Sequence, residues 1–231
     1  MNSFSKGAVS PLLSIWWKRV LSVGTLMLTA CSFHSSPPPF AATGYLADGG
    51  AVRMWRKDGT NGAIHLFTAF SPWTQGDTST GEYTWQDEKL TLIDWHLFRK
   101  TPEHIKIRFD ERGAVSFMQR DVEGSKQQLS PEHIALARYR AERMRDISAA
   151  LVSGHVKLMQ GRWQQDGSVL DCEGHLLAPH LDGAALAHIH RRQQHSSMAV
   201  SVAWLEAPKG SQLLLVANEN FCVWQPQEKD F

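Results

Sequence analysis

The segment EHIKIRFDERGAVSFMQRDV, residues 103–122, decides the fold class because it has the pattern of a β-hairpin. Ile105, Ile107 and Phe109 alternate with Lys106 and Arg108, which is the period of a strand with one buried face. The turn residues DERG follow, and the next run, AVSFMQRDV, is expected to pair back as a second strand. Local pairing of this kind indicates an antiparallel sheet rather than βαβ units.

Short strands and turns continue on the N-terminal side of this hairpin. Turn signals such as KDGTNG and QGDTSTG separate short runs that alternate or are apolar throughout. The runs expected to be strands are residues 51–57, 63–70, 82–86 and 89–98. The sequence therefore predicts an α+β fold with an antiparallel, strongly curved meander sheet, or a half-open barrel, packed with one long and one short helix.

A long helix is expected over residues 132–153. Ser130 is a favourable N-cap, Pro131 suits the first turn, and Gly154 ends the run. One side of this helix carries an apolar stripe that is expected to face the sheet, formed by Ala137, Ala141, Met144, Ile147 and Leu151. The opposite side of the helix is rich in arginine. We interpret this arginine-rich side as a solvated face, with binding to anionic lipid head groups or to a protein partner as the alternatives.

The C-terminal third is expected to add more strands and the short helix. That helix covers residues 181–194, with Asp182 as its cap. Strands are expected over residues 155–163 and 168–174, followed by a hairpin of residues 198–208 and 211–224.

The N-terminal segment has the composition of an export signal. Residues 1–19 contain three basic and no acidic side chains, and residues 20–30 form an 11-residue apolar run. A membrane-spanning helix needs about 20 apolar residues. The run is too short for that but fits the apolar region of a secretory signal.

The end of this run, Leu28-Thr29-Ala30-Cys31, resembles the lipobox of bacterial lipoproteins. The resemblance implies cleavage between Ala30 and Cys31, lipidation of the Cys31 thiol and acylation, for example with palmitate, of the new amino terminus. Acyl chains contribute about 0.8 kcal/mol per buried CH₂, and more than one chain gives stable anchoring. The alternatives are an ordinary signal peptide with an incidental cysteine, or a buried N-terminal helix.

This resemblance also implies a compartment and a domain organisation. Residue 32 is Ser rather than Asp, which in that family implies the outer membrane, on its periplasmic face; a soluble periplasmic protein is the alternative. We expect a signal peptide over residues 1–30, a lipidated cysteine with a Pro/Ser-rich tether over residues 31–44, and a single periplasmic α+β domain over residues 45–231. The prolines favour an extended tether of up to about 40 Å.

Two further cysteines, Cys172 and Cys222, are expected to form a disulfide if the chain is exported, because the periplasm is oxidising. On the chain-entropy model such a bond stabilises the fold by about 4 kcal/mol. Two buried thiols, or metal ligands, are the alternatives.

The composition argues against several classes of function. The net charge of +1 provides no basic patch for nucleic acid. No GxSxG, GxGxxG, P-loop or HExxH motif is present, so no catalytic residue is assigned, no cofactor is expected, and a hydrolase is a weaker alternative. The histidines leave metal binding as another alternative. Its candidates are His175, His180, His188 and His190.

Large aromatic residues lie mostly in the expected strands. We interpret them as core, with an apolar groove for a lipid or peptide as the sharper alternative. Such a groove, with a helix across a curved sheet, would be similar in architecture to carrier lipoproteins of the Gram-negative envelope. The aromatics are Trp55, Phe67, Phe70, Trp73, Trp85, Trp95 and Trp204.

With the lipobox, the Trp-rich strands and the closing segment VAWLEAPKGSQLLLVANENFCVW, the chain resembles a family of uncharacterised lipoproteins of Gram-negative bacteria over its full length. The resemblance implies the compartment but no activity. We therefore expect a membrane-anchored, non-catalytic binding or assembly module with an envelope protein as partner.

Overall fold

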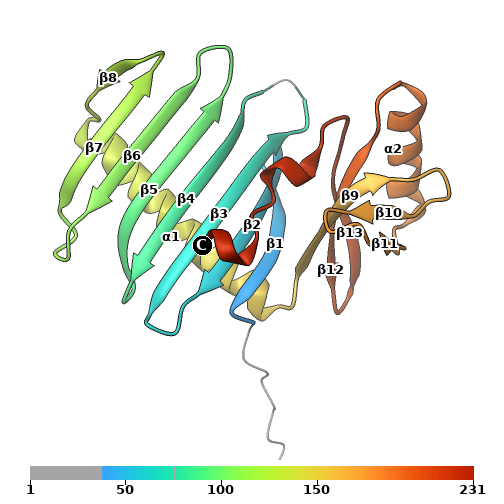
Figure 1. Cartoon of the computed structure of the whole chain (residues 1–231), viewed down its shortest axis with the longest axis horizontal. Helices are drawn as coiled ribbons and strands as arrows, with labels where there is room; N and C mark the ends of the chain where they lie inside the picture. Colours follow the sequence, from blue (N-terminus) through green and yellow to red (C-terminus); the bar gives the residue numbers. More distant parts are fainter. Residues whose placement is uncertain (1–37, 75) are drawn as a thin grey trace, which may run out of the picture. The chain divides into compact units, whose positions relative to one another are not determined.

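Eight consecutive strands form one open antiparallel meander in the computed structural model, which describes residues 38–74 and 76–231. Each strand pairs with the next in the chain, so β1 and β8 are the two edges (Figure 1). The expected α+β class and curved meander are confirmed. The strands are β1 (Phe40–Ala47), β2 (Gly50–Asp58), β3 (Ala63–Pro72), β4 (Thr78–Gln86), β5 (Lys89–Phe98), β6 (Glu103–Phe109), β7 (Val115–Val122) and β8 (Ser125–Gln127).

The hairpin at residues 103–122 forms as its pattern predicts. Ile107 is fully buried and pairs with Met118 across β6 and β7. The turn between the strands is held by Asp110, whose Oδ1 accepts the backbone N–H groups of Arg112 at 2.9 Å and Ala114 at 2.8 Å. Gly113 completes this turn with a φ of 78°, a conformation that glycine adopts without strain.

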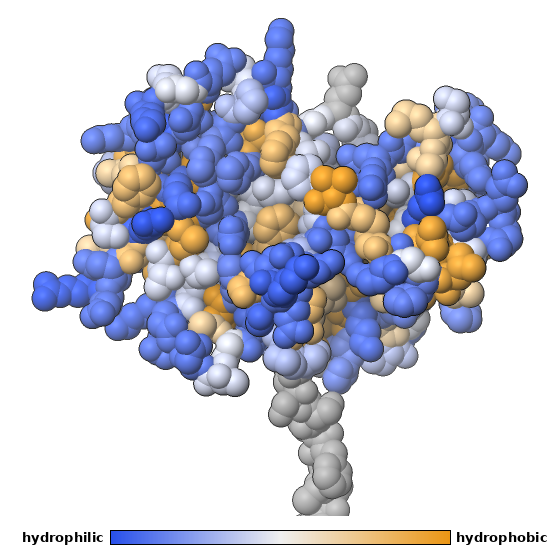
Figure 2. Space-filling view, viewed as in Figure 1, coloured by the Kyte–Doolittle hydropathy of each residue, from blue (hydrophilic) through white to orange (hydrophobic). Residues whose placement is uncertain are grey.

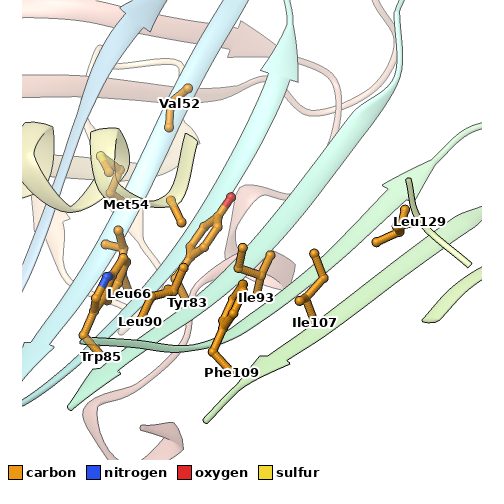
Figure 3. Packing of buried hydrophobic residues seen from close by; sticks show 11 residues of the cluster. Val52, Met54, Leu66, Tyr83, Trp85, Leu90, Ile93, Ile107, Phe109 and Leu129 are labelled. Carbon is orange, nitrogen blue, oxygen red and sulfur yellow. The ribbon is translucent and has the colours of Figure 1, made fainter. Parts of the chain in front are cut away.

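The long helix α1 (Pro131–Ser153) crosses one face of the meander, which we call the inner face (Figure 1). Its N-cap is Ser130, whose side chain accepts the N–H of His133, and its C-cap is Gly154. All five residues of the predicted apolar stripe pack into the inner-face core. Figure 3 shows the sheet side of this core, where Trp85, Leu90 and Phe109 gather at one end of the strands.

The C-terminal strands form a second sheet, a feature that the sequence-based prediction did not specify. It has five antiparallel strands in the order β11-β10-β9-β12-β13, with the short helix α2 (Gly183–Gln194) against it. Its own core contains Trp163, Ile189 and Trp204, and other residues of β9, β12 and β13 pack with Trp55 of β2. The strands are β9 (Lys157–Trp163), β10 (Val169–Asp171), β11 (Leu176–Leu177), β12 (Ser201–Ala207) and β13 (Gly210–Ala217).

Strand β1 begins at Phe40, inside the stretch for which the sequence predicts a tether up to residue 44. The carbonyl of Pro39 already accepts the N–H of Asp58 at 2.8 Å, and residues 40–47 pair with β2 along their length. Gly44 is required here, because a Cβ atom would lie 2.6 Å from the carbonyl oxygen of Val52. Residues 40–44 therefore belong to the sheet rather than to a tether.

The C-terminal segment also differs from the prediction. The expected strand over residues 211–224 ends at Ala217, and a short 3₁₀ helix, η1 (Phe221–Trp224), follows. Asn220 caps this helix by accepting the N–H of Cys222 at 3.1 Å. A second one, η2 (Glu228–Asp230), ends the chain. The segment lies against the face of the meander opposite α1, the outer face (Figure 1).

Within the described ranges, no helix is both long and apolar enough to cross a lipid bilayer.

Candidate ligand-binding groove

A groove of about 850 Å³ lies between α1 and the inner face of the meander. Its walls come from the end of the sheet at which β1, β3, β5 and β7 finish and β2, β4 and β6 begin. Exposed residues of α1, among them Leu136 and Arg140, line its open side. The apolar wall is formed by Tyr45, Val52, Phe70, Ile93, Trp95 and Ile105.

The groove exists because one helix cannot cover the whole inner face. Eight strands spaced about 4.8 Å apart span about 34 Å, whereas a helix with its side chains is about 10 Å wide. Helix α1 runs obliquely across the strands (Figure 1). The far end of the sheet is filled by large side chains, including Trp85 and Phe109 (Figure 3). The end lined by Val52 and Trp95 is left hollow.

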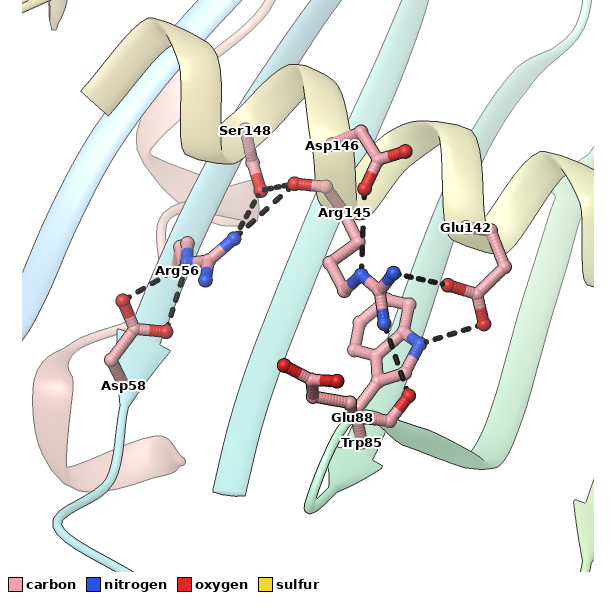
Figure 4. Close-up of polar contacts among 8 residues, drawn as sticks. All are labelled: Arg56, Asp58, Trp85, Glu88, Glu142, Arg145, Asp146 and Ser148. Atoms are coloured by element: carbon pink, nitrogen blue, oxygen red, sulfur yellow. Dashed lines mark hydrogen bonds and ion pairs between the residues drawn. The ribbon is translucent and has the colours of Figure 1, made fainter. Parts of the chain in front are cut away.

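Polar contacts fix α1 over the packed end. The Arg56 guanidinium donates to Ser148 Oγ at 2.9 Å and is paired with Asp58. Trp85 Nε1 donates to Glu142 at 3.2 Å (Figure 4). The Arg145 guanidinium lies 5.9 Å from the centre of the Trp85 ring and pairs with Glu142 at 2.9 Å. Part of the arginine-rich face that we interpret as solvated therefore holds the helix on the sheet.

One buried carboxylate marks the polar wall of the groove. Glu103, at the start of β6, is 9% exposed and accepts hydrogen bonds from Arg120 at 2.6 Å and Arg99 at 2.5 Å. The hydrogen bond from Arg120 holds the pKa of Glu103 below its usual value. This carboxylate is thus ionised at neutral pH and compensated by two arginines, so it acts as a fixed part of the wall rather than as an acid or base.

Tyr83 is a buried residue of the groove wall. Burial raises the pKa of Tyr83 to about 12. Gly81 makes room for it, since a Cβ atom there would lie 2.6 Å from the Tyr83 hydroxyl oxygen. The inner wall therefore offers an apolar environment. The charged residues Arg140 and Asp48 line the groove at exposed positions.

The structure separates the aromatic residues that the sequence leaves as either core or groove. Phe70 and Trp95 line the groove. Trp55, Trp85 and Trp204 are at most 1% exposed and belong to cores, whereas Trp73 is 51% exposed.

Sequence reasoning missed the polar wall. The signal was present at Glu103, because it has the same strand parity as Ile105 and Ile107 and therefore points to the inner face.

The two cysteines predicted to pair do so. Cys172, just after β10, and Cys222, in η1, form a disulfide with their Cα atoms 5.4 Å apart. It ties the C-terminal segment to the second sheet. The predicted lipidation residue Cys31 and its neighbour Ala30 lie outside the described residues.

The histidines singled out as metal candidates are not brought together. His175 pairs with Asp171 at 3.2 Å, and neither His180, His188 nor His190 joins a group of three ligand atoms in the described part of the chain. Such a group does form on the outer face of the meander, from Asp94, His96 and His104.

Comparison with known proteins places the chain among uncharacterised proteins. A family model described as "Protein of unknown function (DUF1481)" matches residues 42–227. The uncharacterized protein YjaH of Escherichia coli (strain K12) is 57% identical over 232 residues, and the match covers 100% of both chains. No solved structure matches the chain.

Proposed function

Because the chain belongs to the DUF1481 family of proteins of unknown function, we propose its function from the groove and from the N-terminal sequence. The protein is a lipid-anchored, non-catalytic carrier on the periplasmic face of the outer membrane. Its groove binds the acyl chain of an amphiphile. The observation that carries the proposal is the apolar groove of about 850 Å³ between α1 and the sheet. This volume lies within the range of about 300–1,000 Å³ that is typical of small-molecule sites.

The lining favours an acyl chain over a peptide. An extended peptide gains affinity by pairing its backbone with a free strand edge. Most of the groove wall, on β2 to β6, comes from strands that are paired on both sides and offer no such edge. The edge strand β1 contributes only Tyr45 and Ala47. An acyl chain needs only apolar contact, and each buried CH₂ contributes about 0.8 kcal/mol. Affinity should therefore rise with chain length until the hollow is full.

The entrance suits the polar end of an amphiphile. Arg140 and Asp48 line the groove at exposed positions, and neither takes part in an ion pair within the described ranges. Their charges remain available to a head group in water. The paired Glu103 and Arg120 complete this polar side of the groove. The ligand would thus lie with its chain against Ile93 and Ile105 and its head toward α1.

Two matched substitutions on α1 test the carrier role. Ala137 lines the groove, whereas Ala135 is exposed, and residues two apart on a helix point to nearly opposite sides. The full-length Ala137→Trp variant should bind an environment-sensitive fluorescent fatty acid about tenfold or more weakly, a loss of about 1.4 kcal/mol. Ala135→Trp should bind like the wild type. Equal binding by all three proteins, measured by titration, would remove the proposal.

Mass spectrometry identifies the natural ligand in the same variants. Protein extracted from membranes should carry a co-purifying lipid in the wild type and in Ala135→Trp but not in Ala137→Trp. If only a peptide is found, the groove is a peptide site and the acyl-chain assignment is wrong.

The anchor rests on the sequence Leu28-Thr29-Ala30-Cys31 and needs its own experiment. The N-terminal peptide of the membrane-extracted protein should begin at Cys31 and carry acyl groups. An unmodified Cys31, or a retained Met1, contradicts lipid anchoring. Membrane fractionation of a Cys31→Ser variant should then show release from the outer membrane, while probe binding by the groove is unchanged.

A further inference from the structure

Three potential metal ligands meet on the outer face of the meander, on the opposite side of the sheet from the groove. Asp94 and His96 lie two residues apart on β5, so their side chains point to the same face. His104 lies on the neighbouring strand β6 and is the direct cross-strand partner of His96. Sites built on strands are held more precisely than sites on loops.

The three ligand atoms converge on a small space. His104 Nε2 lies 2.6 Å from Asp94 Oδ1, and His96 Nε2 lies 3.3 Å from the same oxygen. The two imidazole rings stack with their centres 4.0 Å apart. All three ligand atoms lie within 4.8 Å of one another. Two ligands bound tetrahedrally at about 2.0–2.1 Å are separated by about 3.3 Å. The 2.6 Å between His104 Nε2 and Asp94 Oδ1 would therefore have to widen by less than 1 Å when an ion binds.

A neighbouring lysine orients the carboxylate. Asp94 is buried, and its second oxygen, Oδ2, accepts a hydrogen bond from Lys106 Nζ at 2.5 Å. This contact leaves Oδ1 directed at the two histidines. Hydrogen bonds from surrounding groups orient metal ligands in this way in known sites.

We propose that Asp94, His96 and His104 form a binding site for a divalent transition-metal ion, with zinc as the favoured ion. The ion would take the place of the proton shared by His104 Nε2 and Asp94 Oδ1. Two imidazoles and one carboxylate are typical zinc ligands, and three protein ligands leave one position for water or a second molecule. Copper(II) and nickel(II) use the same donors.

The site is accessible from solvent. The side chains of His96 and His104 are 46% and 35% exposed, whereas Asp94 is 10% exposed. Figure 2 shows the outer face, with hydrophilic side chains over most of it and separate hydrophobic spots between them. A metal ion can therefore reach the ligands without opening the fold. Because the site and the groove lie on opposite faces of the sheet, the two proposals stand independently.

Zinc binding by histidine variants of the untagged full-length protein provides the test. Glutamine at both positions, His96→Gln with His104→Gln, removes the imidazole ligands but retains a hydrogen-bond donor for Asp94. Equilibrium dialysis against Zn²⁺, followed by elemental analysis, should show one equivalent fewer in the double variant than in the wild type. The zinc affinity of this site should fall by more than about 100-fold. A matched control, His188→Gln with His190→Gln, should bind as the wild type does.

Two further measurements keep the test decisive. Zn²⁺ should raise the unfolding temperature of the wild type and of the control but not of the double variant. If the double variant does not fold, the single His96→Gln variant, at the more exposed position, replaces it. Bound Co²⁺ should show the visible absorption of a four-coordinate ion in the wild type and in the control, but not in the double variant. Equal zinc stoichiometry in the wild type and the folded His96/His104 variants would overturn the proposal.

Discussion

The two faces of the eight-stranded meander are covered in different ways. On the inner face, α1 packs against one end of the strands and leaves the other end hollow. On the outer face, the second sheet and the C-terminal segment pack over Trp55 and its neighbours near β1 to β3. Farther along, the outer face carries the polar side chains of β5 and β6, including Asp94 and His104.

The difference follows from the shapes of the covering elements. A sheet presents a broad surface that matches another sheet. Under this cover only a smaller pocket of about 390 Å³ remains, lined by Trp55, Leu158 and Pro226 among others. A 23-residue helix is about 35 Å long but only about 10 Å wide. One helix therefore leaves part of a broad sheet uncovered, and apolar side chains there stay open to a ligand. The proposed binding function depends on this incomplete coverage.

The largest expected effect on stability comes from replacing Trp85, one of two tryptophans on the inner face. Trp85 is 1% exposed at the packed end, and Trp85→Ala should lower the free energy of unfolding by about 3–5 kcal/mol because it leaves a cavity. Trp95 lines the hollow, so Trp95→Ala should cost only about 1 kcal/mol. Urea denaturation measures both. Equal losses would mean that the two ends are packed alike.

The next effect concerns the outer covering. Replacing both cysteines, Cys172→Ser with Cys222→Ser, should lower the free energy of unfolding by about 2–4 kcal/mol, because the unfolded chain is no longer constrained. Fatty-acid binding at the groove should not change in the folded variant. A large loss of binding would show that the two faces are coupled, contrary to their separate packing.

The smallest effect tests whether the groove wall is dry. The pKa of Tyr83 is raised by burial to about 12, above an unfolded value of about 10. The stability that this neutral side chain contributes is fully present below pH 10 and is lost as the pH rises through 12. Between pH 10 and pH 12, the free energy of unfolding of the wild type should therefore fall by on the order of 2 kcal/mol more than that of the Tyr83→Phe variant. Denaturant titrations at several alkaline pH values measure this difference. If the free energies of unfolding of the two proteins change in parallel with pH, water reaches Tyr83 and the groove wall is not dry.

Much of the fold could be predicted from local pattern. The 103–122 hairpin, the caps at Ser130 and Asp182 and the apolar stripe of α1 depend on residues close in sequence, and the structure contains each of them. The strand at Phe40–Ala47 escaped prediction because its small residues lack a clear alternation. One of them, Gly44, can have no side chain, because a Cβ atom there would lie 2.6 Å from the carbonyl oxygen of Val52.

Less of the candidate sites could be predicted. The pairing of Cys172 and Cys222 followed from their number and from the expected compartment, and the structure contains it. The groove was one of two interpretations of the aromatic residues, and only packing separated Trp95 from Trp85. The predicted histidine candidates lie in the C-terminal third, whereas the group that assembles joins β5 to β6.

The sequence by itself determined the strands of the meander from β2 to β7, the ends of both helices and the cysteine pair, because periodicity, capping and cysteine number depend on residues rather than on their positions in space. Tertiary structure alone decided that there are two sheets, since β9 pairs with β12 across about forty intervening residues. It also decided where α1 leaves the inner face uncovered. That hollow is a property of how a helix fits on a sheet, and no local stretch of sequence encodes it.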